Sequence, residues 1–223
     1  SGKSVTAFTI MGLHDTRALT PVKGEILLEG EDLLGDTMQR IRKLRGEKMS
    51  MIFQEPMTAL NPVARVGDQI GEMLEIHTNL SGSERKARVL RAMEDVNLPD
   101  PSSMYRSFPH QLSGGQRQRI MIAMALVLEP VLLIADEPTT ALDVTIQAQI
   151  LDLLGDLQKS ERMGMLFITH DLNIVRRIAD RVCVMKDGVI VEQGKTKDIF
   201  EDPRHPYTQK LLAAEPTGAP PPV

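Results

Sequence analysis

The sequence predicts an α/β fold with a mostly parallel core sheet, and three observations lead to this prediction. Continuous apolar runs at residues 131–135 and 165–168 are typical of strands buried on both faces of a parallel sheet. Residues 144–157, which lie between these runs, carry apolar side chains at helical spacing. Strands that alternate with helices along the chain favour a layered α/β architecture.

Residues 1–65 predict one part of this core together with a small antiparallel β region. A helix over residues 5–13 is expected directly after the first four residues. Residues 24–30, an extended segment between two glycines, suit a hairpin strand. Residues 48–53 are a further strand candidate, which ends at Gln54.

Residues 66–125 predict a helical subdomain. Between residues 66 and 111 the chain carries helical patterns without a convincing strand. Ser81 and Glu84 have the spacing of a capping box, which marks the start of a helix. The expected elements are helices at residues 66–77, 85–96 and 116–128, with a break at residues 98–101.

Residues 126–202 return to the strand–helix pattern of the core. Asp187-Gly188 is a strong hairpin signal between two β-type segments. A C-terminal extension at residues 203–223 ends in a Pro-rich stretch that is typical of a linker. Beyond the strand at residues 165–168, the expected elements are a helix at 171–179, strands at 181–186 and 189–193, and short helices near Asp198 and Gln209.

Composition excludes several classes of protein. The chain has 223 residues, of which 42% are hydrophobic and 25% charged, as in an ordinary globular protein. The single cysteine, Cys183, allows neither an intrachain disulfide nor a Cys-cluster metal site. A net charge of -4 and an aromatic content of 3% argue against nucleic-acid binding. No apolar run approaches the 18 residues or so that a membrane span needs.

Ser1-Gly2-Lys3-Ser4 matches the last four positions of the phosphate loop G-x-x-x-x-G-K-S/T. Backbone N–H groups at a helix N-terminus bind anionic phosphates. Lys3 would neutralise phosphate charge, and the Ser4 hydroxyl would ligate Mg²⁺. A four-residue match also arises by chance in loops, so this segment alone does not decide the function.

Asp136 and Glu137 follow a buried apolar strand. At this position Asp136 could hold the water shell of Mg²⁺, and Glu137 could orient or deprotonate an attacking water. The alternative is a solvated strand end with helix-capping acids. This segment alone leaves both interpretations open.

Ser113-Gly114-Gly115-Gln116 precedes a long helix, where the backbone can approach an anion closely. A plain helix N-cap is the alternative. Two arginines in the four residues that start at Gln116, and an acidic strand end one helix later, argue against that alternative.

Residues 112–119 resemble the signature motif of ABC ATPases. The family's other motifs occur in the same order, so the resemblance covers essentially the whole chain. It implies an ABC-type ATPase domain of the P-loop NTPase fold, with an antiparallel β subdomain and a helical signature subdomain. The matching residues are the Walker A end at Gly2-Lys3-Ser4, the glutamine-loop residue Gln54, the Walker B strand at 132–136 followed by Glu137, the D-loop at 140–143, and the switch histidine His170.

The resemblance also implies a role for each matching residue. ATP and Mg²⁺ are the expected ligands. Glu137 would be the general base, with Gln54 and His170 as further catalytic residues. The residues expected to hold nucleotide are Gly2, Lys3, Ser4, Ser113, Gly114, Gly115, Gln116 and Asp143, and those expected at the metal are Ser4, Gln54 and Asp136.

Members of this family pair two nucleotide-binding domains head to tail, with ATP between the Walker A of one and the signature of the other. The resemblance therefore implies a second nucleotide-binding domain, two transmembrane permease subunits and, indirectly, an extracytoplasmic solute-binding protein. No nucleic-acid partner is expected. The implied location is the cytoplasmic face of the inner membrane, where ATP hydrolysis would drive uptake of peptides or related small solutes.

Finer features resemble the oligopeptide/dipeptide/nickel importer ATPases, namely residues 54–62, residues 135–143 and the His-Pro-Tyr-Thr segment at 205–208. Residues 208–212 and 215–218 are similar to the end of the first half of the Yej-type fused peptide and microcin C importer ATPases. The Pro-rich tail would then link to a second half, and the alternative is the C-terminus of a single-domain subunit. The chain lacks the C-terminal cysteines of iron–sulfur relatives, so no cluster is predicted.

Two departures from the family pattern stand out. Thr140 replaces the serine common at the start of the D-loop, a change that keeps the hydroxyl. The family's first strand, first loop glycine and adenine-stacking aromatic would precede Ser1, so the chain as it stands is expected to bind ATP poorly. Met49, Met51 and Met57 could line a groove for a permease helix, although core packing is the simpler expectation.

Two other functions compete with the importer hypothesis. A soluble ABC ATPase that acts on DNA or ribosomes would need long coiled-coil or basic insertions, which the sequence lacks. A degenerate regulatory half would bind nucleotide without turnover. Glu137, His170 and the intact signature argue against that possibility.

Overall fold

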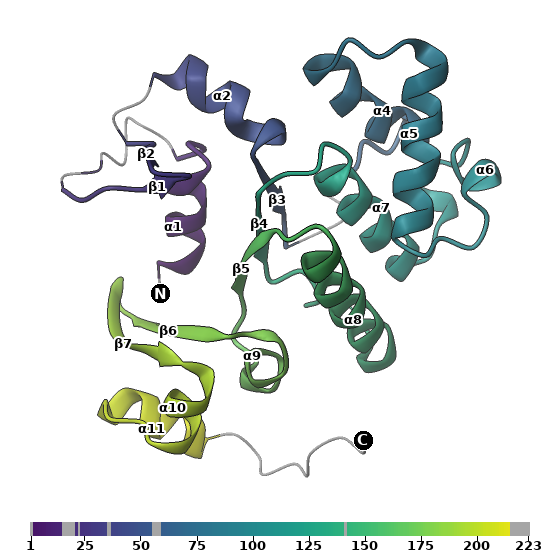
Figure 1. The fold of residues 1–223 in the computed structure, drawn as a ribbon. Helices are drawn as coiled ribbons and strands as arrows, with labels where there is room; N and C mark the ends of the chain where they lie inside the picture. The colour runs from purple at the N-terminus through teal and green to yellow at the C-terminus, as the bar shows by residue number, and fades with distance from the viewer. Residues whose placement is uncertain are drawn as a thin grey trace. The chain divides into compact units, whose positions relative to one another are not determined.

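The computed structural model describes residues 2–14, 21, 23–34, 37–54, 59–140 and 142–214. The chain divides into two compact units, and each is described by itself. The larger unit is Val5–Ile168, and the smaller unit combines Ser1–Ser4 with Thr169–Val223. Figure 1 labels the elements of both units. In the described part of the chain, no helix is both long and apolar enough to cross a membrane.

A three-stranded parallel sheet forms the centre of the larger unit (Figure 1). Its strands are β3 (Met49–Ile52), β4 (Leu132–Asp136) and β5 (Gly164–Ile168), in the order β3-β4-β5. The parallel pairing confirms the predicted α/β class. Because neighbouring strands run in the same direction, all three end at one edge of the sheet.

Two hydrophobic clusters cover the two faces of this sheet. Leu133 belongs to one cluster and Ile134 to the other, because successive residues of a strand point to opposite faces. The smaller cluster includes Ala7 and Met11, from helix α1 (Lys3–Ile10) and the turn that follows it. The larger cluster is built with helices α4 (Val66–His77), α5 (Gly82–Asp95), α7 (Gly114–Leu126) and α8 (Val144–Ser160).

The helical region agrees with the sequence prediction at its capping box. The Ser81 backbone N–H donates to Glu84 Oε2 at 2.8 Å, and the Glu84 N–H donates to Ser81 Oγ at 3.4 Å. The hydrogen bond from the Ser81 side chain, together with that from its backbone, holds the pKa of the Glu84 carboxyl below its usual range. The helix predicted over residues 66–77 is confirmed as α4 with the same bounds.

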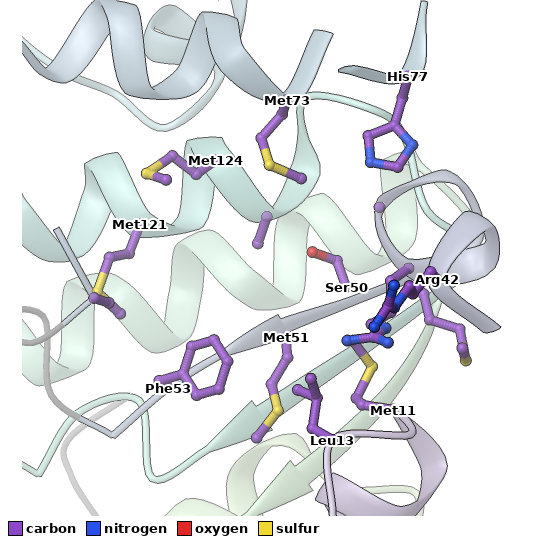
Figure 2. A pocket seen from close by; sticks show the side chains of 15 residues that line it. Met11, Leu13, Arg42, Ser50, Met51, Phe53, Met73, His77, Met121 and Met124 are labelled. Atoms are coloured by element: carbon purple, nitrogen blue, oxygen red, sulfur yellow. The ribbon is translucent and has the colours of Figure 1, made fainter. Parts of the chain in front are cut away.

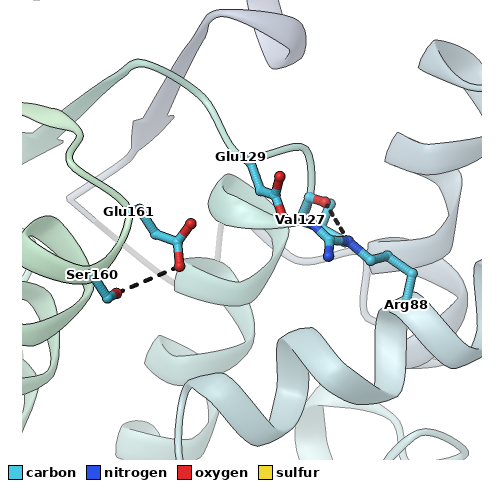
Figure 3. A network of polar contacts seen from close by, with 5 residues as sticks. All are labelled: Arg88, Val127, Glu129, Ser160 and Glu161. Atoms are coloured by element: carbon cyan, nitrogen blue, oxygen red, sulfur yellow. Dashed lines mark hydrogen bonds and ion pairs between the residues drawn. The ribbon is translucent and has the colours of Figure 1, made fainter.

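Two arginines connect α5 and α7, and each contacts residues just beyond the C-terminus of the other helix. Arg88 of α5 donates from Nε to the Val127 carbonyl at 3.3 Å and forms an ion pair with Glu129, just beyond α7 (Figure 3). Arg119 of α7 donates from Nη1 to the carbonyl of Val96, just beyond α5, at 2.7 Å. These reciprocal bonds fix α7, whose N-terminus carries the signature segment.

Helix α2 (Met38–Glu47) has no counterpart in the sequence prediction. Thr37 begins it by accepting from the Arg40 N–H at 3.3 Å. Of its residues only Ile41 and Gly46 are buried, so the apolar spacing that indicates a helix is missing. Its last turn is kinked at Gly46, where φ is 87°.

One further prediction needs correction, and one further helix was not predicted. The strand expected over residues 24–30 is only β1 (Leu27–Leu28), which pairs antiparallel with β2 (Glu31–Asp32). The break expected at residues 98–101 is present after α5, and it leads into an unpredicted helix, α6 (Pro101–Met104), which begins because Asp100 accepts from the Ser103 N–H at 3.1 Å and Pro101 occupies the first helical turn. A short 3₁₀ turn, η1 (Pro109–Gln111), precedes α7.

The smaller unit is built on the predicted hairpin, whose turn has φ of 50° at Asp187 and 82° at Gly188, as a type I′ turn requires. The helices predicted around it are also confirmed. The Pro-rich segment at residues 216–223 lies outside the described residues. The elements are α9 (Leu172–Ile178), β6 (Arg181–Lys186), β7 (Val189–Lys195), α10 (Thr196–Glu201) and α11 (Pro206–Ala213).

Candidate active site

The phosphate-loop end of the chain lies in the smaller unit. Helix α1 begins at Lys3, so Lys3 and Ser4 occupy its first turn, where the helix dipole is positive. Lys3 Nζ donates to the backbone carbonyl of Thr169 at 2.9 Å. Gly2 has φ of 92°, a conformation that favours glycine. Ser1 lies outside the described residues.

His170 belongs to the same unit and follows directly after Thr169, whose carbonyl binds Lys3. Its side chain is exposed. The Thr169 hydroxyl accepts from the Asp171 N–H at 3.0 Å, and the Asp171 carboxylate caps α9. These bonds fix the segment that carries His170 beside the N-terminus of α1.

Two residues predicted to be catalytic, Gln54 and Glu137, meet at the carboxyl edge of the sheet in the larger unit. Gln54 follows β3, and Glu137 follows the neighbouring strand β4. Gln54 Nε2 donates to Glu137 Oε2 at 3.1 Å although 83 positions separate the two residues. The structure therefore brings Gln54 together with Glu137, and Asp136 precedes Glu137 in the chain.

Glu137 is held on several sides. Its backbone N–H donates to the Ile168 carbonyl at 2.9 Å, and its φ of 47° is left-handed, which is uncommon for a residue other than glycine. The Thr140 hydroxyl donates to the same oxygen, Oε2, at 3.0 Å. The sequence prediction considered Thr140 only as a substitution that keeps a hydroxyl. The available signal for its contact with Glu137 was that the two residues are three positions apart, within one turn.

Asp136 is 5% exposed at the end of β4. Among the described residues, no group of three or more His, Cys, Asp or Glu side chains could hold a metal ion. The buried Asp136 carboxylate supplies oxygen ligands at the end of the strand. It fits Mg²⁺, which binds one or two protein carboxylates and completes its shell with water and phosphate oxygens.

The signature segment forms a helix N-cap, and an anion could also approach its glycine backbone. Ser113 Oγ accepts from the Gln116 N–H at 3.2 Å, and the Gln116 side chain accepts from the Ser113 N–H at 2.9 Å. A Cβ placed on Gly115 would come 2.9 Å from Ile146 of α8, whereas the nearest such contact at Gly114 is 3.9 Å. Gly115 is thus required for packing, while Gly114 leaves space above the helix.

Asp143, predicted to contact nucleotide, is the N-cap of α8. Its Oδ1 accepts from the Ile146 N–H at 3.0 Å. Ala141, between Thr140 and Leu142, lies outside the described residues. The D-loop therefore makes one side-chain contact at each end. Thr140 binds Glu137, and Asp143 caps the start of α8.

A pocket of about 350 Å³ opens beside β3 in the larger unit (Figure 2). Met49 and Met51 are 0% and 8% exposed, so core packing accounts for both, yet the same side chains line this pocket. Met57 lies outside the described residues. Its methionines come from separate segments and are Met11, Met49, Met51, Met73, Met121 and Met124.

A basic group borders the methionines. Arg42 and Arg45 of α2 line the pocket, as does His77 of α4. Burial, and secondarily the charge of Arg42, lowers the pKa of the Arg45 guanidinium. Arg45 Nε is buried without a hydrogen-bond partner among the described residues. The pocket thus combines an apolar, adaptable wall with a buried donor that lacks an acceptor.

Comparison with known proteins agrees with the motifs. The family description "ABC transporter" matches residues 1–140, and the description "Oligopeptide/dipeptide transporter, C-terminal region" matches residues 191–221. The peptidoglycan transport ATP-binding protein YejF of Agrobacterium fabrum is 56% identical over 99% of this chain and 40% of its own length. The oligopeptide transport ATP-binding protein OppD of Lactococcus lactis subsp. cremoris is 48% identical over 98% of this chain and 64% of its own length. The chain thus spans about half the length of these curated relatives.

Solved structures confirm the predicted cassette fold. The ATP-binding cassette MJ0796, in a dimeric post-hydrolysis state bound to ADP and Pi, has a TM-score of 0.75 at 29% identity, over 87% of this chain and 81% of that chain. CbiO1 from Clostridium perfringens, part of the ABC transporter complex cbiONQ, has a TM-score of 0.77 at 32% identity, over 90% of this chain and 75% of that chain. The chain belongs to the ABC transporter family of ATP-binding proteins.

Proposed function

We propose that this chain is the ATP-hydrolysing part of an importer of peptides or related small solutes. The observation that carries the proposal is the contact between Gln54 and Glu137 at the carboxyl edge of the sheet, where β4 also ends in the buried Asp136. A carboxylate positioned by neutral donors next to a second carboxylate suits water activation beside a cation. Phosphoryl transfer from ATP to water needs this combination of positioning and charge stabilisation.

Lys3 would supply positive charge to the proposed site, and the neutral Ser4 would supply a hydroxyl ligand for the metal ion. When ATP binds, Lys3 Nζ would exchange the Thr169 carbonyl for a phosphate oxygen, and the backbone N–H groups at the start of α1 would bind the same phosphate. Ser4, Asp136 and Gln54 would hold Mg²⁺, which neutralises charge on the phosphates. Glu137 would accept a proton from the attacking water, while the exposed His170 would contact the γ-phosphate.

The signature residues are proposed to act on a second nucleotide. Ser113 is exposed at the N-terminus of α7, and Gly114 leaves space for an anion there. Gln116 would keep Ser113 in place through the capping box, and Asp143 would approach the same nucleotide from α8. A head-to-tail pair of domains would bring these groups to ATP bound by the other domain, and the dimeric MJ0796 cassette is a precedent for pairing.

The relatives support a peptide as the transported solute, since they are named for peptidoglycan and oligopeptide transport. We propose two permease subunits and a solute-binding protein as partners, at the cytoplasmic face of the inner membrane. Residues 1–65 and 126–202 would form the ATP-binding core and residues 66–125 the helical subdomain. Residues 203–223 would form an extension, which would lead to a second nucleotide-binding half in a fused protein.

The methionine pocket is the proposed docking site for the permease. An apolar helix segment of the permease would enter it, and a carboxylate on that segment would accept from the buried Arg45 Nε. Met51 and Phe53 line the pocket, and Phe53 directly precedes Gln54, so a docked segment would lie next to a proposed catalytic residue. Met73→Asp would weaken copurification with the permease, whereas Met38→Asp, at an exposed methionine outside the pocket, would not.

The chemical proposal is tested with the chain extended upstream of Ser1 to complete the phosphate loop. Hydrolysis of ATP should require Mg²⁺ and should be lost in Lys3→Ala, while Lys159→Ala on α8 serves as a control for removal of one lysine. Magnesium-independent hydrolysis, or full activity of Lys3→Ala, would refute the proposed site.

A further inference from the structure

The phosphate-loop end rests directly on the β6–β7 turn of the smaller unit. A Cβ placed on Gly2 would come 3.3 Å from Gly188 Cα and 3.5 Å from Met185 Sδ. The two backbones can approach this closely because Gly2 has no Cβ, while Gly188 serves the turn through its positive φ of 82°. The position of the turn therefore helps to determine the position of the loop backbone.

The C-terminal segment holds this turn in place. Lys186, the residue just before the turn, places Nζ 5.0 Å from the centre of the Tyr207 ring in α11. This distance is within the range of a cation–π interaction. In Figure 1, α11 lies beside the β6–β7 hairpin, in agreement with this contact.

Glu192 of β7 makes a second connection between the hairpin and this segment. Its carboxylate accepts from the Arg204 N–H at 2.8 Å and from the His205 N–H at 3.1 Å. The buried Thr208 hydroxyl faces the same carboxylate; although its geometry falls outside that of a regular hydrogen bond, it contributes most to a lowered pKa of Glu192, followed by the Arg204 N–H. His205 Nδ1 also accepts from the Tyr207 N–H at 3.1 Å, which restrains the backbone that carries the ring.

We propose that residues 203–213 are a positioning element for the phosphate loop, with Tyr207 as the positioning residue. Tyr207 fixes the position of the Lys186 side chain, and Lys186 fixes the position of the adjoining Asp187-Gly188 turn. This turn supports the backbone at Gly2. A loop that binds phosphate through backbone N–H groups depends on its geometry, and small displacements weaken such binding. The C-terminal region thereby tunes the affinity for ATP. This inference rests on the proposed function, because it takes Gly2-Lys3-Ser4 to bind nucleotide phosphate.

The test uses the chain extended to a complete phosphate loop, and it measures KM for ATP and kcat separately. Tyr207→Leu removes the aromatic face and should raise KM about two- to fivefold, the size of an exposed cation–π contact. Turnover should be unchanged, because Glu137 and Gln54 belong to the other unit. Tyr207→Phe keeps the aromatic face and should restore the normal KM.

A second pair of variants guards against a folding defect in Tyr207→Leu. Lys186→Met should raise KM in the same way, while Lys197→Met removes an exposed lysine of the same unit and should not. An unchanged KM in Lys186→Met, or an equal rise in Tyr207→Phe, overturns the inference. If hydrolysis by the wild-type chain does not depend on Lys3, the proposed function has failed instead, so the two failures are distinguishable.

Discussion

Two groups of candidate residues, a carboxylate half in the larger unit and a loop half in the smaller unit, are built in different ways. Around Glu137, side chains do the positioning, since Gln54 and Thr140 both donate to one carboxylate oxygen. Around Gly2, the backbone does the positioning, through a helix start and the close approach of Gly188. The difference suggests that the carboxylate half responds to single hydrogen-bonding atoms, whereas the loop half responds to any added bulk.

The largest effect in this comparison is expected at Gly2. Gly2→Ala places a methyl group 3.3 Å from Gly188 Cα at φ of 92°. A cost of about 1–3 kcal/mol for such strain would weaken nucleotide binding roughly 5- to 150-fold. Calorimetric titration with ATP would measure this change. Gly155→Ala in α8 is the matched control, because a Cβ there would meet no atom of the described residues within 4 Å. An equal loss of ATP binding in that variant would contradict the explanation.

A smaller effect is expected at Thr140. Thr140→Val keeps the shape but removes the hydroxyl that donates to Glu137 Oε2. The loss of one hydrogen bond, about 0.5–1.5 kcal/mol, would lower kcat roughly two- to tenfold. Thr140→Ser retains the hydroxyl and should restore the rate of single-turnover hydrolysis. A valine variant with full activity would show that Glu137 does not need this donor.

A stability effect without a chemical effect is expected at Ser81, far along the chain from either half of the site. Ser81→Ala removes one member of the capping box of α5 and should cost about 1 kcal/mol in the free energy of unfolding. Denaturant titration would measure it, and kcat should not change. A change in kcat would indicate that the helical region influences the chemistry through α5.

The smallest effect is a pH dependence in the smaller unit. The nearby Thr208 hydroxyl first, and then the hydrogen bond from the Arg204 N–H, hold the pKa of Glu192 below the ordinary value of 4.5. The resulting stability is therefore present above about pH 4.5 and is lost as the pH falls through the lowered pKa. The difference in unfolding free energy between wild type and Glu192→Gln should shrink in this acidic range. A difference that stays constant with pH would contradict this role of Glu192.

Much of the fold could be predicted because its central elements carry strong local signals. The apolar run at residues 131–135 became a buried strand between two others, and Asp187-Gly188 formed the expected turn. Helix α2 could not be predicted in this way, because its surface position leaves almost no apolar spacing and its start depends on the Thr37 cap. The prolines near residue 100 correctly predicted a break after α5, but not the short helix that Asp100 caps and Pro101 begins.

The candidate site was predictable in its residues but not in its contacts. The motifs place Gln54 and Glu137 after separate strands, and only the parallel pairing of β3 with β4 brings them together. The three-residue spacing was the only signal for the Thr140 contact, and the sequence does not indicate the left-handed backbone at Glu137 that accompanies it. The support of Gly2 by Gly188 joins residues 186 positions apart, so no local pattern could predict it.

The central claim, that Glu137 is the general base of an ATP-hydrolysing site, is tested most directly by Glu137→Gln. The chain is extended upstream of Ser1, and both ATP binding and hydrolysis are measured. Removal of a general base should slow hydrolysis about 10²- to 10⁴-fold while ATP binding is retained. Glu94→Gln, at an exposed position on α5, should change neither quantity. Hydrolysis by Glu137→Gln at the wild-type rate would contradict the account.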